Sequence, residues 1–278
     1  MLTLSSDFGS PYPAAMKGVI SQKTTARVVD IGHDFPRGDV RAAAFWLREI
    51  LPYYPPATHL AVVDPGVGTD RRAIVVRAGE HALVGPDNGV LYPPARALAA
   101  GTGGDLEAFE IDESATETDL LEIPRDPATT DGNRTNDRGA TFHGRDVFAP
   151  AAATVHETPL DRLGSLAGLS PVDVESLVEE TIPTASVETD PDRARGEVLV
   201  VDDFGNVITN VPGAFLAGRE SIEANGRRVP VEAAFASVPP GDRLATVGEH
   251  GYVELDVNDG RGDDAFSLDR GDDVVLEP

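Results

Sequence analysis

The sequence predicts an α/β protein: an N-terminal α/β domain with a mostly parallel sheet, followed by a smaller C-terminal antiparallel β-barrel domain. Two observations favour this fold class. Through the first two-thirds of the chain, short apolar runs alternate with helical patterns, which is typical of a parallel sheet covered by helices. In the last third, apolar residues recur at every second position between turns rich in Gly, Asn and Asp, as in small antiparallel domains.

The elements of the N-terminal domain follow in chain order. The apolar run LTLSS predicts the first strand, and Pro11 and Pro13 predict the start of the first helix because proline is favoured in a first helical turn. The second helix is amphipathic, with one face formed by Ala42, Phe45, Trp46 and Ile50. The expected strands are Leu2–Ser6, Arg27–Ile31, His59–Val63, Ala73–Arg77 and Ala82–Val84, and the expected helices are Tyr12–Gln22, Asp39–Leu51 and Arg145–His156.

Two polar stretches set the expected domain limits. Residues from about 111 to 138 contain eight acidic residues, several threonines and two prolines, which predicts a solvated acidic loop within an N-terminal domain of residues 1–187. Residues 188–195 are polar and contain a proline, as a linker would, and the C-terminal domain then spans residues 196–278. Its expected strands are Glu197–Val201, Arg228–Val231, Tyr252–Val257 and Asp273–Leu276.

The charge balance excludes some partners. The formal net charge is −24, and only two of the 23 basic residues are lysines, Lys17 and Lys23. Such a surface repels phosphate backbones, so we expect no nucleic-acid partner. Acid excess with few lysines is typical of halophilic proteins, because at about 1 M salt the Debye length falls to about 3 Å and like charges are screened.

Other compositional features narrow the class further. The chain has no cysteine, which excludes disulfides, thiolate zinc sites and cysteine nucleophiles. No apolar run is long enough for a transmembrane helix, so no membrane partner is expected. The N-terminus has no basic region of the kind that begins a signal peptide, and we therefore expect a cytoplasmic protein.

Four Gly- and Asp-rich segments are the candidates for function. They are SSDFG at residues 5–9, DPGVGTDR at 64–71, TFHGRD at 141–146 and DDFGNVITN at 202–210. Three of them lie where an expected strand ends, and ligands of parallel α/β sheets bind at the carboxyl ends of strands. Neither GxGxxG after a strand nor GxxxxGK[ST] is present, which argues against a Rossmann dinucleotide site and a P-loop.

Each candidate residue also has a plain structural interpretation. Asp7 could cap a helix, Asp64 could begin a turn before Pro-Gly, and Arg71 could be a surface charge. His143 could be structural, and Asn88 in PDNG could be a turn residue. The remaining histidines show no ligand spacing, so no metal site is expected.

The four segments in this order resemble the S-adenosyl-L-methionine (SAM) hydroxide adenosyltransferases, the adenosine-forming SAM hydrolases related to the fluorinase and chlorinase. DPGVGTDRR, VGPDNGVL, TFHGRDVFAPAAA and VDDFGNVITN occur in succession, and the resemblance extends from residue 2 to 275. It implies an N-terminal α/β domain with a C-terminal β-barrel. It also implies that water or hydroxide attacks the ribose C5′ of SAM, which releases adenosine and L-methionine, with SAM as substrate and no cofactor.

The resemblance assigns roles to individual residues. The family's catalytic Asp–Arg–His trio corresponds to Asp64, Arg71 and His143, and which of the three takes the proton is left open. In chemical terms, a histidine such as His143 has an intrinsic pKa of about 6.5, Arg71 can stabilise a developing hydroxide, and Asp64 can orient either partner.

Substrate contacts are implied in the same way. Asp7 corresponds to the aspartate that holds the ribose hydroxyls, Asp202 to the one that faces the methionine ammonium, and Asn206 to the asparagine that reads the adenine edge. Phe204 and Tyr252 could wall the base or simply pack in the core. The other expected substrate-binding positions are Asn88 and Gly144. Two departures from the family pattern, Ser10 and the segment Gly248-Glu249-His250, concern the methionine end.

Two rival functions remain. In a halogenase the residues at positions 64 and 143 are replaced, and the fluorinase has a halide-binding serine where this chain has Gly144; all three positions here follow the hydrolase pattern. A non-catalytic SAM- or adenosine-binding module would be favoured if a member of the trio were missing, and none is. Family analogy further implies a homotrimer with the site at the subunit interface.

Overall fold

The computed structural model describes residues 1–113, 142–190 and 192–278. The chain divides into two compact units, residues 1–181 and 182–278. The expected linker at 188–195 lies instead largely in two paired strands, β8 (Ser186–Thr189) and β9 (Asp192–Val201). The polar composition of this stretch reflects exposed strands joined by an ion pair between Arg193 and Glu188. From residue 114 on, the expected acidic loop lies outside the described residues.

The first unit is built on a seven-stranded sheet in the order β2-β1-β3-β5-β4-β6-β7. Strands β2, β1, β3 and β5 are parallel, whereas β4, β6 and β7 are antiparallel to their neighbours. The sheet is therefore parallel in the first half of its strand order, as expected. The strands are β1 (Leu2–Ser6), β2 (Val28–Gly32), β3 (Thr58–Val62), β4 (Ala73–Ala78), β5 (His81–Pro86), β6 (Leu106–Ile111) and β7 (Leu169–Val172).

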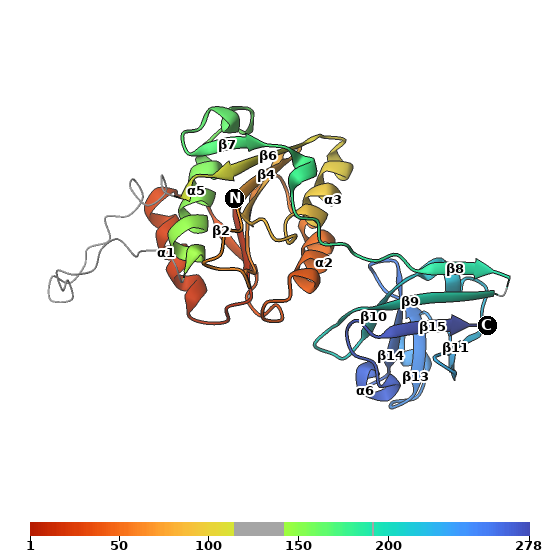
Figure 1. The fold of residues 1–278 in the computed structure, drawn as a ribbon. Helices are drawn as coiled ribbons and strands as arrows, with labels where there is room; N and C mark the ends of the chain where they lie inside the picture. The colour runs from red at the N-terminus through yellow and green to blue at the C-terminus, as the bar shows by residue number, and fades with distance from the viewer. Residues whose placement is uncertain (114–141, 191) are drawn as a thin grey trace. The chain divides into compact units, whose positions relative to one another are not determined.

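Helices cover both faces of this sheet. Figure 1 shows α1 and α5 on one side and α2 and α3 on the other. The helices are α1 (Tyr12–Lys23), α2 (Val40–Ile50), α3 (Tyr92–Thr102) and α5 (Ala149–Glu157), the last preceded by a π-helical turn at Gly144–Phe148. Short 3₁₀ turns occur at Leu51–Tyr53, Leu160–Ser165 and Val174–Ser176. The unit is a three-layer α/β sandwich.

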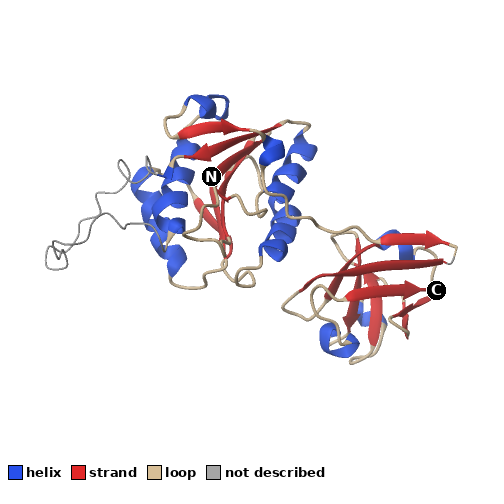
Figure 2. Cartoon of the chain, in the orientation of Figure 1, coloured by secondary structure: helices blue, strands red, loops and turns tan. Residues whose placement is uncertain are grey.

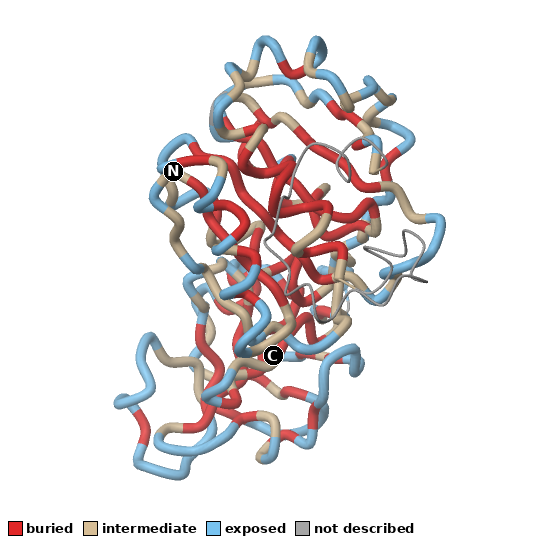
Figure 3. The backbone as a smooth tube through the Cα atoms, turned by 90° about the vertical axis from the view of Figure 1, so that its left-hand side faces the viewer, coloured by how far each residue is buried: buried red, intermediate tan, exposed pale blue. Residues whose placement is uncertain are grey.

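Strand alternation explains why two separate cores form. Leu60 and Val62 of β3 pack in the core under α1 and α5, whereas Ala61 and Val63 pack in the core under α2 and α3. Successive residues of a strand point to opposite faces, so a strand covered on both faces must be apolar throughout. Figure 3 accordingly shows buried chain through the centre of this unit and exposed segments around it.

Local signals set the helix ends. Asp39 caps α2, where its Oδ1 accepts the Ala42 N–H at 3.0 Å. Gly103 ends α3 with a φ of 65°, a left-handed conformation that glycine adopts without steric cost. Helix α3 and strands β6 and β7 are additional to the elements expected from the sequence.

The second unit is an antiparallel sheet of eight strands. Its order is β12-β11-β15-β9-β10-β14-β13, with β8 paired to β9, and Figure 2 shows it as mostly strand. A bridge between Val231, which follows β12, and Ala245 in β13 joins the two ends of the order and nearly closes a barrel. The remaining elements are β10 (Val207–Pro212), β11 (Ser221–Ala224), β12 (Arg227–Pro230), β13 (Arg243–Val247), β14 (Tyr252–Val257), β15 (Asp273–Glu277) and α6 (Gly262–Phe266), with 3₁₀ turns at Gly213–Leu216 and Phe235–Ser237.

Candidate active site

The candidate site begins where two neighbouring parallel strands end. Asp7 directly follows β1, and Asp64 lies two residues after the end of β3. From β1 the chain turns toward β2, whereas from β3 it turns toward β4 on the other side of the sheet order. Because the two connections leave in opposite directions, a crevice opens between the strand ends.

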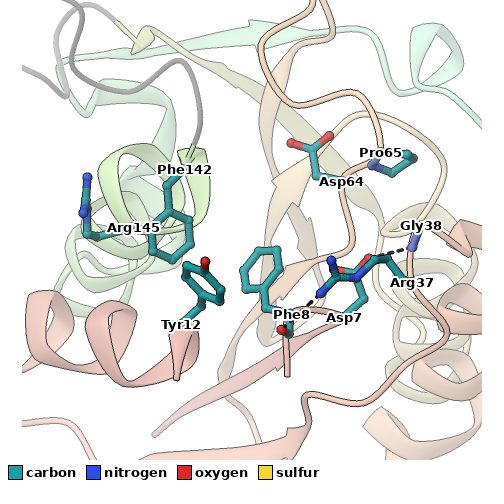
Figure 4. Close-up of a pocket in the computed structure, with 9 residues that line it drawn as sticks. All are labelled: Asp7, Phe8, Tyr12, Arg37, Gly38, Asp64, Pro65, Phe142 and Arg145. Carbon is teal, nitrogen blue, oxygen red and sulfur yellow. Dashed lines mark hydrogen bonds between the residues drawn. The ribbon is translucent and has the colours of Figure 1, made fainter. Parts of the chain in front are cut away.

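Both aspartates line one cleft of about 660 Å³ within the first unit. In Figure 4, Asp7 and Asp64 lie on one side of it, and Tyr12, Phe142 and Arg145 lie on the other. The remaining lining residues are Phe8, Arg37, Gly38 and Pro65. Arg37 and Gly38 follow the end of β2 and were not singled out from the sequence, although the strand-end rule applies to that strand as well.

Asp7 is held in place by the loop after β2. Its Oδ2 accepts the backbone N–H of Gly38 at 2.7 Å. This bond uses one carboxylate oxygen and, among the described residues, leaves the other for the cleft. The interpretation of Asp7 as a helix cap does not fit, because no side chain caps α1.

The expected trio is assembled around Arg71. Its Nη2 donates to Asp64 Oδ2 at 2.7 Å, and its Nε is 3.2 and 3.1 Å from the two Asp64 oxygens, so the contact is fork-like. The two side chains are only 9% and 3% exposed. Arg71 is thus not a surface charge. Its guanidinium also lies 5.1 Å from the centre of the Phe148 ring.

His143 joins the same guanidinium from a distant part of the chain. Its Nδ1 lies 2.6 Å from Arg71 Nη2, and its side chain is 9% exposed. Arginine can only donate, so Nδ1 accepts in this contact, and a neutral ring that makes it carries its hydrogen on Nε2. The structure therefore brings Asp64, Arg71 and His143 together, as the sequence interpretation expected.

A fourth charged residue completes this group. Glu113 Oε1 accepts from Arg71 Nη1 at 3.0 Å, and its Oε2 lies 3.7 Å from His143 Nδ1. Glu113 comes two residues after β6, in a stretch whose composition indicated only an acidic loop. Sequence reasoning missed it because nothing in the local pattern separates it from its acidic neighbours.

Aromatic rings form the opposite side of the cleft. Phe8, Tyr12 and Phe142 meet edge to face, with ring centres 5.5 to 6.4 Å apart. A Cβ added to Gly144 would lie 3.0 Å from Phe142 and 3.2 Å from both Phe8 and Met16. A residue larger than glycine at this position would have to shift this aromatic cluster.

Asn88 has a structural role in the turn after β5. Its Nδ2 donates to the Val63 carbonyl at 2.8 Å, and its Oδ1 accepts from the Val90 N–H at 3.2 Å. These bonds fix the chain beside the end of β3. The residue does not line the cleft that contains Asp7 and Asp64.

The second unit holds the other expected binding residues on the loop between β9 and β10 and on β14. Asp202 Oδ1 accepts the backbone N–H groups of Phe204 and Asn206, both at 2.9 Å, and its Oδ2 accepts Asn206 Nδ2 at 3.0 Å. The loop presents Phe204 to solvent, 79% exposed, so this ring is not a core residue of the unit. Tyr252, at the start of β14, is half-buried.

Two further carboxyls of β14 lie near Asp202. Burial, with the charges of Asp202 and Glu249, raises the pKa of Glu254 to about 7. Burial, with the charges of Glu254 and Asp202, raises the pKa of Asp256 to about 8. Asp256 is fully buried, and neither of its carboxyl oxygens has a hydrogen-bond partner among the described residues.

Two absences within the described part of the chain bear on partners. These residues contain no group of three or more His, Cys, Asp or Glu side chains arranged to hold a metal ion. No helix among them is long and apolar enough to cross a membrane.

The fold and the site are those of a two-unit α/β enzyme. More particularly, the chain belongs to the SAM hydroxide adenosyltransferase family, since residues 2–164 match the family's N-terminal domain and residues 196–275 its C-terminal domain.

Relatives and solved structures agree over the whole length. The chain is 41% identical to the (R)-S-adenosyl-L-methionine hydrolase of Salinispora arenicola, over 98% of this chain and 96% of that protein. It is 42% identical to the protein of the same name from Thermus thermophilus, over 98% and 97%. A crystal structure of a conserved protein from Thermotoga maritima superposes with a TM-score of 0.78 at 30% identity, covering 100% of both chains. A crystal structure of a conserved protein from Thermus thermophilus gives 0.68 at 36% identity, covering 99% and 98%.

Proposed function

We propose that this chain hydrolyses SAM to adenosine and L-methionine by attack of water or hydroxide on the ribose C5′. The observation that supports this most directly is the single hydrogen-bonded group of Asp64, Arg71 and His143 at the carboxyl edge of the sheet. Two segments distant in sequence, 64–71 and 141–146, contribute to it, which a surface turn or a structural histidine would not require.

The chemistry explains why a group of this kind is sufficient. The sulfonium leaves as a neutral thioether, so the leaving group needs no proton. The difficulty lies with the nucleophile, because water has a pKa of about 15.7 and must be deprotonated or strongly polarised as it attacks. A site for this reaction needs a fixed positive charge, an oriented acceptor and a route for one proton.

Each member of the group supplies one of these needs. Arg71 is permanently cationic and, at 9% exposure, acts where water screens it little, so it stabilises developing hydroxide. Asp64 lines the cleft while both of its oxygens contact Arg71, and it orients the attacking water by accepting a hydrogen bond. His143 carries the imidazole, the side chain suited to exchanging protons near neutral pH, and receives the proton.

Substrate binding follows from the remaining residues. We assign the ribose hydroxyls to Asp7, whose second oxygen stays available in the cleft. Asn206 is assigned to the adenine edge, and the exposed ring of Phe204 is assigned a stacking contact with the adenine. Asp202 is assigned to the methionine ammonium. Tyr252 is a further wall of the base. Asn88 contributes by holding the strand ends, and Gly144 by leaving room for the aromatic cluster.

Halogenation is the alternative that the cleft argues against. A halide-binding serine in place of Gly144 would crowd Phe8 and Phe142, and Asp64 and His143 are both retained. The test is to incubate the purified protein with SAM in high chloride and separate the products by chromatography. Adenosine and methionine are expected. A main product of 5′-chloro-5′-deoxyadenosine would overturn the proposal, and tight adenosine binding without any product would favour a non-catalytic binding protein.

We further propose that the protein is a homotrimer that works in a cytoplasm of high salt. The trimer follows from the family resemblance, and the salt from the net charge of −24 with two lysines. Light scattering after gel filtration in about 2 M KCl, where surface charge is strongly screened, should give three times the chain mass of 29.3 kDa. A mass of one chain would contradict the trimer.

A further inference from the structure

We propose that Glu113 is a positioning residue that sets the tautomer of His143, and that the proton removed from water leaves the site on its side. The inference rests on the proposed hydrolysis, for which it names the proton route. Glu113 lies outside the expected trio, yet it contacts Arg71 and approaches His143 Nδ1 with the two oxygens of one carboxylate.

One ring nitrogen faces two competing partners. Arg71 Nη2 lies 2.6 Å from Nδ1 and can only donate, whereas Glu113 Oε2 lies 3.7 Å away and, as a carboxylate, can only accept. When Nδ1 accepts from Arg71, the hydrogen is on Nε2, and that nitrogen cannot take a proton. When Nδ1 carries the hydrogen and donates it to Glu113, Nε2 has a free lone pair.

The choice of partner therefore decides whether His143 can act as a base. Arg71 favours the inactive tautomer, and Glu113 favours the basic one. An imidazolium would repel Arg71 and attract Glu113, so the carboxylate also stabilises the product of proton transfer. Because Oε1 of the same carboxylate already holds Arg71 Nη1 at 3.0 Å, Glu113 keeps the guanidinium in place while Oε2 pairs with the ring.

Glu113 also faces a second opening. It lines a cavity of about 550 Å³ together with Arg71, and none of the residues that line this cavity also lines the substrate cleft. The side chain of Glu113 is 37% exposed, against 9% for Arg71. A proton that reaches Glu113 can thus enter solvent without passing through the substrate cleft.

The atoms and electrons of this step balance. The water oxygen forms a bond to C5′, the C5′–S bond breaks with its electron pair going to sulfur, and one water O–H bond breaks as its proton moves to Nε2 of His143. The imidazolium then donates its Nδ1 proton toward Glu113, which passes it to solvent in the second cavity. This leaves the ring hydrogen on Nε2, and exchange with solvent after product release returns it to the Nδ1–H tautomer that Glu113 favours. The net products are adenosine, methionine and one proton.

Other charges around the ring do not substitute for Glu113. Asp64 is engaged by Arg71, and on the turn after His143 the side chains of Arg145 and Asp146 pair with each other at 2.6 Å. The other charged residues that line the second cavity are Asp70, Arg72, Glu110 and Asp112.

The decisive variant is Glu113→Gln, which keeps an acceptor for Arg71 but removes the charge. We expect kcat to fall about 10- to 100-fold with KM for SAM within about threefold. The acid limb of the kcat–pH profile should move to lower pH, because an imidazolium that loses a carboxylate partner is a stronger acid. Glu113→Asp should recover part of kcat and the position of the acid limb.

Glu110→Gln is the matched control. It removes the same charge from a residue lining the same cavity and should leave kcat and the pH profile unchanged. If Glu113→Gln lowered thermal stability and kcat together while the acid limb stayed in place, Glu113 would be a structural brace and the proposal would be wrong. An unaltered kcat would also overturn it. Absence of adenosine formation by the parent protein would instead reject the proposed hydrolysis.

Discussion

The two units each contain a cluster of carboxyl groups, and the clusters differ in one respect. In the first unit, Asp64 and Glu113 both contact the guanidinium of Arg71. In the second, Glu254 and Asp256 lie close to each other and to Asp202, and their pKa values rise to about 7 and about 8. The first cluster contains a cation that compensates its negative charge. In the second cluster Glu254 and Asp256 keep their protons to higher pH, because burial and the neighbouring negative charges disfavour their ionised forms.

Buried histidines extend the contrast. His59 and His81 stack in the first unit, with His59 Nε2 at 2.9 Å from His81 Nδ1 and Thr3 at 2.8 Å from His59 Nδ1. Burial, with the nearby His81, lowers the pKa of His59 to about 3. Each unit therefore has a neutral titratable group in its interior, but of opposite kind. We therefore expect the first unit to lose stability in acid and the second to lose stability in base.

The largest expected effect comes from removing the cation of the first cluster. Arg71→Met should lower kcat about 10²- to 10⁴-fold, the usual range for an electrostatic or acid–base group in the transition state. Binding of adenosine should change little, because Arg71 is assigned no ground-state contact. Single-turnover assays and calorimetric titration measure the two effects separately. Turnover at the parental rate would show that water is activated by other residues.

Two variants control this experiment. Arg72→Met removes the neighbouring guanidinium, which pairs with the buried Asp87 rather than with Asp64 or His143, so kcat should survive. Asp7→Ala should fail in the opposite manner, with adenosine bound about 10- to 100-fold more weakly, since a charged hydrogen bond contributes about 1.5–3 kcal/mol. Equal adenosine affinity for Asp7→Ala and the parent would remove Asp7 from the ribose site.

The second cluster predicts a loss of stability in base. The folded pKa of Asp256, about 8, lies above its ordinary value of 3.8, so its contribution to stability is full below 3.8 and is lost as pH rises toward 8. The slope is about 1.4 kcal/mol per pH unit. Asp256→Asn cannot ionise, so its melting temperature should match the parent near pH 4 and exceed it increasingly up to pH 8. Glu277→Gln, an exposed acid on β15, should show no such divergence. If the melting temperatures of Asp256→Asn and the parent differed by the same amount at every pH in this range, the raised pKa of Asp256 would be contradicted.

How much of this the sequence could predict depends on how local each signal is. Short apolar runs in the sequence identified β1, β3 and β5, and the ends of the expected strands then identified Asp7 and Asp64. Both signals are local, because each lies within a few residues. The antiparallel half of the first sheet was not expected, since nothing local records that β6 and β7 pair back onto β4. The stretch 188–195 was expected to be a linker, and it is largely strand, for a related reason. A polar hairpin and a linker have the same composition.

In the candidate site, the sequence could identify only the residues that lie within motifs. Arg71 and His143 belong to segments recognisable as such, but their bond to each other depends on a fold that brings residues 71 and 143 within 2.6 Å. Glu113 has no motif, and Asp256 is fully buried on a strand where an alternating pattern would suggest an outward acid. For these residues, function depends on what surrounds the carboxyl group, and only tertiary structure supplies that.

The histidine pair of the first unit predicts a smaller effect of opposite sign. The folded pKa of His59, about 3, lies below its ordinary value of 6.5, so the unfolded chain binds a proton that the folded chain does not. Stability should fall as pH decreases from 6.5 toward 3, by about 1.4 kcal/mol per pH unit. His59→Gln should flatten this dependence in thermal melts, whereas His250→Gln in the second unit should not. If both variants kept the full acid dependence, other buried groups would be responsible.

Added salt should affect the charged surface and not the buried groups. Its effect on the melting temperature is the smallest of the effects predicted here. The formal net charge of −24 produces mutual repulsion, which is screened as the Debye length falls from about 10 Å at 0.1 M to about 3 Å at 1 M. The melting temperature should therefore rise by about 5 °C between about 0.1 and 2 M KCl, which corresponds to about 1–2 kcal/mol for a protein of this size. Most of the rise should occur below about 1 M, where the Debye length changes most.

The divergence of Asp256→Asn from its parent should persist in about 2 M KCl, because ions do not reach a fully buried carboxyl. An unchanged or lower melting temperature in high salt would reject the halophilic interpretation of the composition, and a rise that stayed linear up to about 2 M would indicate a general salting-out effect instead of charge screening.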